Sequence, residues 1–178
     1  MKRLHAAMTT ACVEYRIVGG MGVFLQVSER DPNAARFTRD VDISVSRKDL
    51  QRITEIASEF GFRYRHAANV DMLVDAEQRI ARSAVHLLFT GEKVRPHYLE
   101  PVPGFSPATI TQEGFPLAPV ADLVRMKLTS FRLKDKVHLL DMDGVGLITP
   151  EIEAALTEPL RARLQQVREE ERQSPSDT

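Results

Sequence analysis

The sequence predicts an α+β domain of α/β-like order, in which a small mixed sheet is flanked by helices and followed by a helical C-terminal section. Three observations predict this class. Residues 40–45 alternate apolar and polar side chains, as a half-buried strand does, whereas residues 47–60 carry apolar residues at helical spacing. Helical patterns return from residue 120. The length of 178 residues suits one compact domain.

The first part of the chain predicts helix, strand, helix and strand. Residues 3–13 have apolar side chains at the spacing of a short amphipathic helix. Residues 15–20, YRIVGG, predict a buried strand that ends in two glycines, and residues 21–29 predict the next helix. Residues 30–36 are charged and rich in turn formers, so we expect a loop before the strand at 40–45.

The middle of the chain predicts one helix and three strands. The helix has one apolar face and is expected to stop at Gly61, because glycine commonly caps helix C-termini. Strand character follows at residues 62–67, 70–76 and 83–90. The polar stretch between the last two, residues 77–82, is expected to turn a hairpin.

The rest of the chain suggests how the domain is divided. Residues 95–119 are rich in proline and predict an extended connection with little regular structure of its own. We expect a single domain over residues 1–170, with a core at 1–94, this connection, and a helical section at 120–170. The tail at 171–178 is expected to be disordered.

The charges are balanced, with 24 Lys and Arg against 25 Asp and Glu and a net charge of -1. No global basic field therefore indicates nucleic acid or an anionic membrane as a partner. Cys12 is the only cysteine, which excludes an internal disulfide or a thiolate zinc cluster and fits a reducing compartment. The basic N-terminus lacks the apolar core of a signal peptide, and no window approaches the roughly 20 apolar residues of a membrane span. We expect a cytoplasmic protein without membrane contact.

Asp40 and Asp42 flank one valine in the predicted strand. Because side chains alternate between the faces of a strand, both acids lie on one face and the apolar Val41, Ile43 and Val45 lie on the other. The Cα atoms of the acids are about 7 Å apart at a rise of roughly 3.3 Å per residue, so both carboxylates can lean toward one divalent cation. The alternative is a solvated strand face with incidental acids.

Two other features bear on this choice. Gly19 and Gly20 join a strand to a helix, so backbone N–H groups and the positive helix end can approach a phosphate, although a tight turn alone also explains them. Lys127 lies within the apolar stripe of a helix predicted from residue 120 to about 140, with Lys134 on the same side. A lysine there needs an anion, such as a ligand phosphate, or a stem that reaches solvent.

A resemblance to a known superfamily rests on these residues. Residues 15–45, YRIVGGMGVFLQVSERDPNAARFTRDVDISV, resemble the opening of the DNA polymerase beta-type nucleotidyltransferases: a strand ending in two glycines, a helix, and an acid-hydrophobe-acid strand. Residues 127–142, KLTSFRLKDKVHLLDM, are similar to the lysine-bearing helix of the abortive-infection-type branch, which includes toxins of toxin–antitoxin pairs. The resemblance covers roughly residues 10–145 and implies a nucleotidyltransferase-like core.

The resemblance implies two groups of site residues. Asp40 and Asp42 would bind two Mg²⁺ ions when a nucleoside triphosphate is bound. The nucleotide-binding group, in which Thr38 would order the turn before Asp40, comprises Gly19, Gly20, Thr38, Lys127 and Lys134.

One position departs from the superfamily. A third carboxylate normally comes from a neighbouring strand, and the matching segment here, AVHLLF, has His86 in its place. A neutral imidazole can ligate a metal or accept a proton but brings no negative charge. Asp71 and Asp75 would substitute if a hairpin brought one of them beside Asp42. The remaining readings of His86 are a catalytic residue or a strand histidine bonded within the sheet.

The resemblance therefore implies an enzyme that transfers a nucleoside monophosphate from a triphosphate such as ATP to an acceptor hydroxyl, with Mg²⁺ as cofactor. An RNA end such as that of a tRNA, a protein and a small molecule such as an aminoglycoside are all compatible acceptors. The rival hypothesis is a protein of this fold that has lost catalysis and acts as a nucleotide sensor or as an interaction partner in a toxin–antitoxin pair. His86 in place of an acid is its main support.

Overall fold

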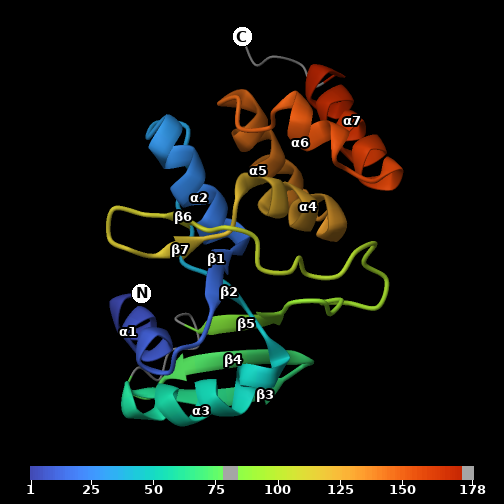
Figure 1. Ribbon diagram of the computed structural model, residues 1–178. Coiled ribbons are helices and arrows are strands. Elements are labelled where there is room, and N and C mark those ends of the chain that lie inside the picture. Colours follow the sequence, from blue (N-terminus) through green and yellow to red (C-terminus); the bar gives the residue numbers. More distant parts are fainter. Residues whose placement is uncertain (78–83, 174–178) are drawn as a thin grey trace.

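A computed structural model describes residues 1–77 and 84–173 (Figure 1). It confirms the predicted α+β class, because a mixed sheet carries helices on both faces. The hairpin turn expected at residues 77–82 falls, apart from Glu77, outside the described residues, and so do residues 174–178 of the expected tail.

The elements alternate along the chain as predicted through the second strand and the helix after it. The helices of the described residues are α1 (Lys2–Thr10), α2 (Gly19–Arg30), α3 (Leu50–Glu59, after a 3-10 turn at Arg47–Asp49), α4 (Val120–Ser130), α5 (Leu133–Gly144), α6 (Pro150–Ala154) and α7 (Glu158–Gln173). The strands are β1 (Tyr15–Val18), β2 (Val41–Val45), β3 (Phe62–Ala67), β4 (Val70–Asp75), β5 (Val85–Phe89), β6 (Thr109–Ile110) and β7 (Pro116–Leu117).

Within the described residues, the sheet has the strand order β3-β4-β5-β2-β1-β7-β6. Strand β2 lies at its centre, antiparallel to β1 and parallel to β5. Strand β7 pairs in parallel with β1, and β6 pairs with β7 at the edge. The proline-rich connection therefore contributes two short strands to the sheet and is otherwise largely irregular, as expected.

The alternation in β2 sorts its side chains onto two faces as predicted. Ile43 and Val45 are fully buried in an apolar cluster that includes residues of α1 and α3. Asp42 and Ser44 point to the opposite face. Figure 1 shows α1 and α3 at one end of the view, with α2, α4 and α5 at the other end. The acid-bearing face of β2 is thus turned away from the α1–α3 layer.

A second apolar cluster joins α2 to the C-terminal helices. Its fully buried members include Leu123 and Leu128 of α4, Leu139 of α5 and Leu160 of α7. The cluster also contains Val18, the last residue of β1. It therefore packs the C-terminal helices against the glycine turn that follows β1.

The single helix predicted from residue 120 to about 140 is wrong, because α4 and α5 are two helices that meet at a bend. Phe131 ends α4 in a left-handed backbone conformation, with φ 49° and ψ 33°. No glycine or proline marks this bend, so the helical spacing runs through it in the sequence. At the other end of the section, α7 continues to Gln173, into the segment expected to be disordered.

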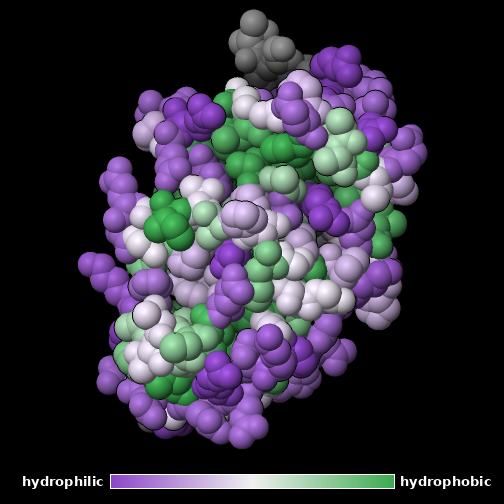
Figure 2. All heavy atoms as spheres, in the orientation of Figure 1, coloured by the Kyte–Doolittle hydropathy of each residue, from purple (hydrophilic) through white to green (hydrophobic). Residues whose placement is uncertain are grey.

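The face of the molecule seen in Figure 2 is mainly hydrophilic, with apolar side chains gathered over α5 and α6. Among the described residues, no helix combines the length and the apolar character needed to cross a membrane.

Candidate active site

The turn between β1 and α2 brings a glycine against one of the acids. Gly19 begins α2 with a positive φ of 66°, which residues with a Cβ rarely adopt. A Cβ atom at this position would lie 2.8 Å from Cγ of Asp42 and closer still to Oδ2. Only glycine therefore fits between the backbone of this turn and the carboxylate. At Gly20, a Cβ atom would instead meet Thr38 and His138.

The two acids occupy different environments. Asp42 is half-buried within β2, where its register partners are Val18 of β1 and His86 of β5. Asp40 lies just before the strand and is exposed. The backbone N–H of Asp40 donates a hydrogen bond of 3.3 Å to the hydroxyl oxygen of Thr38, so Thr38 orders the turn before this acid, as expected.

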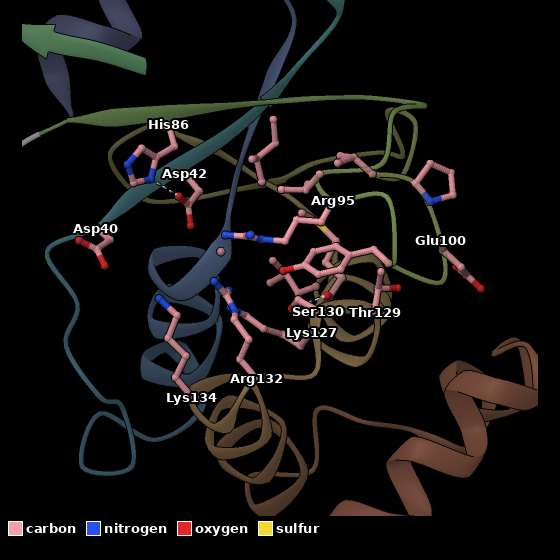
Figure 3. Close-up of a pocket in the computed structure, with 18 of the residues that line it drawn as sticks. Asp40, Asp42, His86, Arg95, Glu100, Lys127, Thr129, Ser130, Arg132 and Lys134 are labelled. Carbon is pink, nitrogen blue, oxygen red and sulfur yellow. Dashed lines mark hydrogen bonds and ion pairs between the residues drawn. The ribbon is translucent and has the colours of Figure 1, made fainter. Parts of the chain in front are cut away.

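His86 lies opposite Asp42 in the register of β5 with β2. Its Nδ1 is 2.8 Å from Oδ1 of Asp42, and Figure 3 shows the two side chains facing each other. This hydrogen bond raises the pKa of His86; burial opposes the shift, while the charges of Asp42 and Asp40 add to it. Asp42 therefore favours the protonated, positively charged form of the residue that stands in place of the expected third acid.

These residues open onto one pocket of about 240 Å³. Gly19, Asp40, Asp42 and His86 line it on one side. The other side is formed by the segment around residues 94–102, by α4 and by the start of α5. Figure 3 shows its polar side chains, among them Arg95, Glu100, Lys127, Ser130, Arg132 and Lys134.

Lys127 lines this pocket, but its ammonium group is bound by the protein. The side chain is buried, and Nζ lies 3.1 Å from Oδ1 of Asp135. Burial lowers the pKa of Lys127, while the neighbouring Asp135 favours the charged form. The anion that a lysine at this position requires is therefore a protein carboxylate, whereas we expected a ligand phosphate.

Other cations face the acids more directly. Arg95 and Lys134 have no ion-pair partner in the described part of the chain, and both line the pocket. Arg132 is bonded through Nε to Asp135 at 2.7 Å. Figure 3 shows all three cations directed toward the space in front of Asp42. This surplus of positive charge beside the glycine turn suits an anionic ligand such as a phosphate.

The two proposed substitutes for the third acid lie elsewhere. Asp71 pairs in register with Leu87, whose side chain belongs to the α1–α3 face, and Asp75 is on the same face of β4 as Asp71. Asp71 is bonded to Tyr64 and to His66, and Asp75 forms an ion pair with Arg3. Neither acid can join Asp42, because the sheet separates them.

The donor set can be compared with the two Mg²⁺ ions that the resemblance implies. Mg²⁺ prefers oxygen ligands and is usually bound by one or two carboxylates together with substrate phosphates. Asp40 and Asp42 meet that need for one ion. Among the residues that the structure describes, no three acidic, histidine or cysteine side chains form a group that could hold a metal. Asp40 and Asp42 are therefore the residues of this pocket that could hold Mg²⁺ together with a phosphate.

Arg95, Arg132 and Asp135 were not identified as site residues from the sequence. The apolar surroundings of Lys127 signalled a missing anion, but Asp135 lies eight residues away, about 12 Å along an unbroken helix, which is too far for contact. Arg95 lies in the proline-rich connection, where no periodicity assigns a face to its side chain. No local signal marks these residues as members of one site.

No protein-family model and no curated protein matches this chain. Among the solved structures that share its fold are two of one protein. The solution structure of the antibiotic-resistance factor ANT(2'')-Ia has a TM-score of 0.56 at 12% sequence identity and covers 96% of this chain and 92% of its own. A crystal structure of ANT(2'')-Ia in complex with adenylyl-2''-tobramycin has a TM-score of 0.55 at 11% identity and covers 93% of this chain and 94% of its own. The likeness confirms a nucleotidyltransferase-like fold over nearly the whole length.

Proposed function

We propose that this protein is a nucleotidyltransferase, which transfers a nucleoside monophosphate from a nucleoside triphosphate to an acceptor hydroxyl. The acceptor oxygen attacks the α-phosphorus, the bond to the bridging oxygen breaks, and pyrophosphate leaves. The observation that carries this proposal is the contact of Gly19 with Asp42 in a pocket that also holds Asp40 and the cations of Arg95 and Lys134. The fold shared with ANT(2'')-Ia, which is seen with an adenylylated tobramycin, supports it.

The phosphates would bind between the glycine turn and the cations. The backbone N–H groups at the start of α2 favour an anion, because they have no partner within the helix and lie at its positive end. Lys134, Arg95 and the free edge of Arg132 would offset the charge that develops on the departing pyrophosphate. Lys127 would act indirectly, through Asp135, since its ammonium group is already paired.

Asp40 and Asp42 would hold Mg²⁺ together with oxygens of the triphosphate. The ion supplies charge neutralisation and polarises the α-phosphate when bound. His86 bonds Asp42 through Nδ1. In the neutral form of the ring, Nε2 would be free to take the proton of the acceptor hydroxyl.

The second candidate is a nucleotide-binding protein with impaired catalysis, for instance one partner of a toxin–antitoxin pair. The hydrogen bond between His86 and Asp42 favours this candidate, because it favours a positively charged ring where a third carboxylate is expected and occupies one oxygen of a proposed metal ligand. Such a protein would bind triphosphates in the same pocket without turnover.

The charges that line the pocket favour some classes of acceptor over others. Adenylyl-2''-tobramycin in the neighbour's complex contains an aminoglycoside, which is a polycation. Of the carboxylates that line this pocket, Asp42 is bonded to His86, and Glu100 is bonded to Arg125 and Thr157. Only Asp40 remains, and the proposal assigns it to Mg²⁺. An RNA end, a protein hydroxyl or an uncharged small molecule therefore suits this pocket better than an aminoglycoside.

The decisive experiment follows label from each of four α-labelled triphosphates, with Mg²⁺, into RNA, protein and small-molecule pools. Asp40→Asn/Asp42→Asn should abolish transfer and triphosphate binding. Glu55→Gln/Glu59→Gln on α3 removes the same charge from exposed positions on the opposite face and should change neither. Binding without transfer by the natural protein would select the impaired candidate, and absence of both would overturn the proposal.

A further inference from the structure

A buried carboxylate lies directly behind the pocket. Asp135, in the first turn of α5, is completely inaccessible to solvent. Its Oδ1 accepts a hydrogen bond from Nζ of Lys127 at 3.1 Å, and its Oδ2 accepts one from the Ser130 hydroxyl at 2.7 Å. Nε of Arg132 and the backbone N–H of the same residue also donate to Oδ2, at 2.7 and 3.1 Å. The carboxylate is thus satisfied by donors from α4 and from the bend that precedes α5.

These contacts span the strained point of the chain. Phe131 holds a left-handed conformation that costs free energy for a residue with a Cβ, and such strain persists only where the surroundings hold it. Asp135 ties the residues on either side of Phe131 together. The Phe131 ring is also covered by the cations of Lys136 and Arg163, each at 4.7 Å from its centroid. The bend is therefore fixed by specific side-chain contacts.

The geometry at Arg132 leaves half of the guanidinium free. Asp135 engages Nε and, at 3.3 Å, Nη2, which is the side-on arrangement of an arginine with a carboxylate. Nη1 has no hydrogen-bond partner among the described residues, and the side chain is 52% exposed. Figure 3 shows the guanidinium directed into the pocket, beside the ammonium group of Lys134 from the same turn.

The charges of Asp135, Lys127 and Arg132 do not cancel. One carboxylate faces two cations, Lys127 and Arg132, so the cluster keeps one net positive charge. The buried ammonium group of Lys127 needs Asp135 close by, because an unpaired charge in this apolar setting is costly. The exposed Arg132 does not need neutralisation. The surplus charge therefore resides on the side chain that reaches the pocket.

We infer that Asp135 is a positioning residue of the triphosphate site: it clamps Arg132 and the bend so that the free edge of Arg132, and Lys134 beside it, face the phosphates bound opposite Asp40 and Asp42. Lys127 serves as the buried counter-ion that keeps Asp135 ionised. This inference rests on the proposed function, since it concerns the binding of the same triphosphate.

The first test is a double-mutant cycle on triphosphate affinity, measured by calorimetry with Mg²⁺ and the triphosphate that the natural protein binds best. Arg132→Gln should weaken binding roughly tenfold or more, because a hydrogen-bonded charge is lost from the phosphates. Lys127→Met/Asp135→Leu replaces the buried pair with apolar side chains, an exchange that folded proteins often tolerate, and should weaken binding to a similar extent. In that background Arg132→Gln should have little further effect.

Additive losses in this cycle would overturn the inference, because Asp135 would then not act through Arg132. The corresponding nucleoside should bind all variants about equally, which separates a lost phosphate contact from general damage to the fold. Asp143→Asn is the matched control: Asp143 is also on α5 and accepts two bonds from Arg168, but it does not line the pocket. It should leave triphosphate affinity unchanged.

A second variant keeps the inference open to refutation if the double replacement does not fold. Arg132→Lys retains the charge but cannot make the bidentate contact with Asp135, so it should lose most of the affinity that Arg132→Gln loses. Affinity equal to that of the natural protein would refute positioning. Failure of the natural protein to bind any triphosphate would instead refute the proposed function, and the inference with it, so the two failures are distinguishable.

Discussion

Gly19 and Asp42 are in such close contact that a single carbon atom added to the glycine would lie 2.8 Å from Cγ of the acid. Gly19 directly follows β1, and Asp42 lies in β2; they meet because β1 and β2 are antiparallel neighbours whose register ends at Val18 and Asp42. The carboxylate of Asp42 is therefore in direct contact with the backbone at the start of α2. This contact is the geometric basis of the proposed site, and it can be tested by substitution.

Gly19→Ala is expected to abolish triphosphate binding and to destabilise the fold. The positive φ alone costs about 1–2 kcal/mol for a residue with a Cβ, and the new methyl group must also displace the Asp42 side chain. Gly91 is a matched control, since its φ is +77° and nothing lies within 4 Å of an added Cβ atom. Gly91→Ala should show only the backbone cost in urea unfolding and retain binding. Equal behaviour of the two variants would contradict the proposed contact.

His86→Asp is expected to increase Mg²⁺-dependent transfer, because it places a third carboxylate beside Asp42 in the register of β5 with β2. Without metal, the same variant should melt at a lower temperature, since the attractive pair becomes two like charges. The measurements are transfer rates and melting temperatures with and without Mg²⁺. His86→Gln, which has neither charge nor ring, is the control. If His86→Asp loses transfer as completely as His86→Gln, the imidazole itself is required.

The bond between His86 and Asp42 should make stability depend on pH. The pKa of His86 is raised above its ordinary value of 6.5 in the folded protein, chiefly by the hydrogen bond with Asp42. The contribution of the protonated His86 to the free energy of unfolding is therefore complete below pH 6.5 and is lost as the pH rises through the raised pKa. The stability difference between the natural protein and His86→Gln should be largest in mild acid and shrink in alkali. A difference that grows with pH would show that the imidazole is bound in its neutral form.

His138 should affect the pH dependence of stability in the opposite direction to His86. Burial, with a smaller effect from the charge of Lys127, lowers the pKa of His138 to about 4, and its Nδ1 has no hydrogen-bond partner within residues 1–77 and 84–173. The contribution of the neutral His138 to stability is therefore complete above pH 6.5 and is lost as the pH falls through about 4. In His138→Leu, the free energy of unfolding in urea should fall less between pH 7 and pH 4 than it does in the natural protein. An equal fall in both proteins would show that other groups cause the loss of stability in acid.

The parts of the fold that could be predicted from the sequence depend on short-range patterns. The period of two in residues 40–45 assigns Ile43 to the core and Asp42 to the other face, and that assignment is confirmed. The glycine turn after a buried strand was also predictable, because only glycine tolerates the backbone conformation and the close approach found at Gly19. Such patterns depend on backbone geometry that is the same in every strand and turn.

The C-terminal part of the site was predicted less well. Lys127 was expected to need either a ligand phosphate or a stem that reaches solvent, whereas its partner is Asp135, which becomes reachable only through the bend at Phe131. Helical spacing cannot reveal a bend that no glycine or proline marks. The bend exists because contacts within the folded protein, among them those of Asp135 and Arg163, hold Phe131 in a backbone conformation that it does not favour by itself.

The sequence by itself determined which residues share a face of β2, that two glycines join a buried strand to a helix, and that position 86 holds a histidine in place of the acid that the resemblance implies. Only the tertiary structure decided that His86 bonds Asp42, that Asp71 and Asp75 lie across the sheet, and that Lys127 is paired within the protein. The reason is physical: local periodicity follows from the geometry of one chain segment, whereas the partner of a charge depends on strand register and helix bends that the whole fold selects.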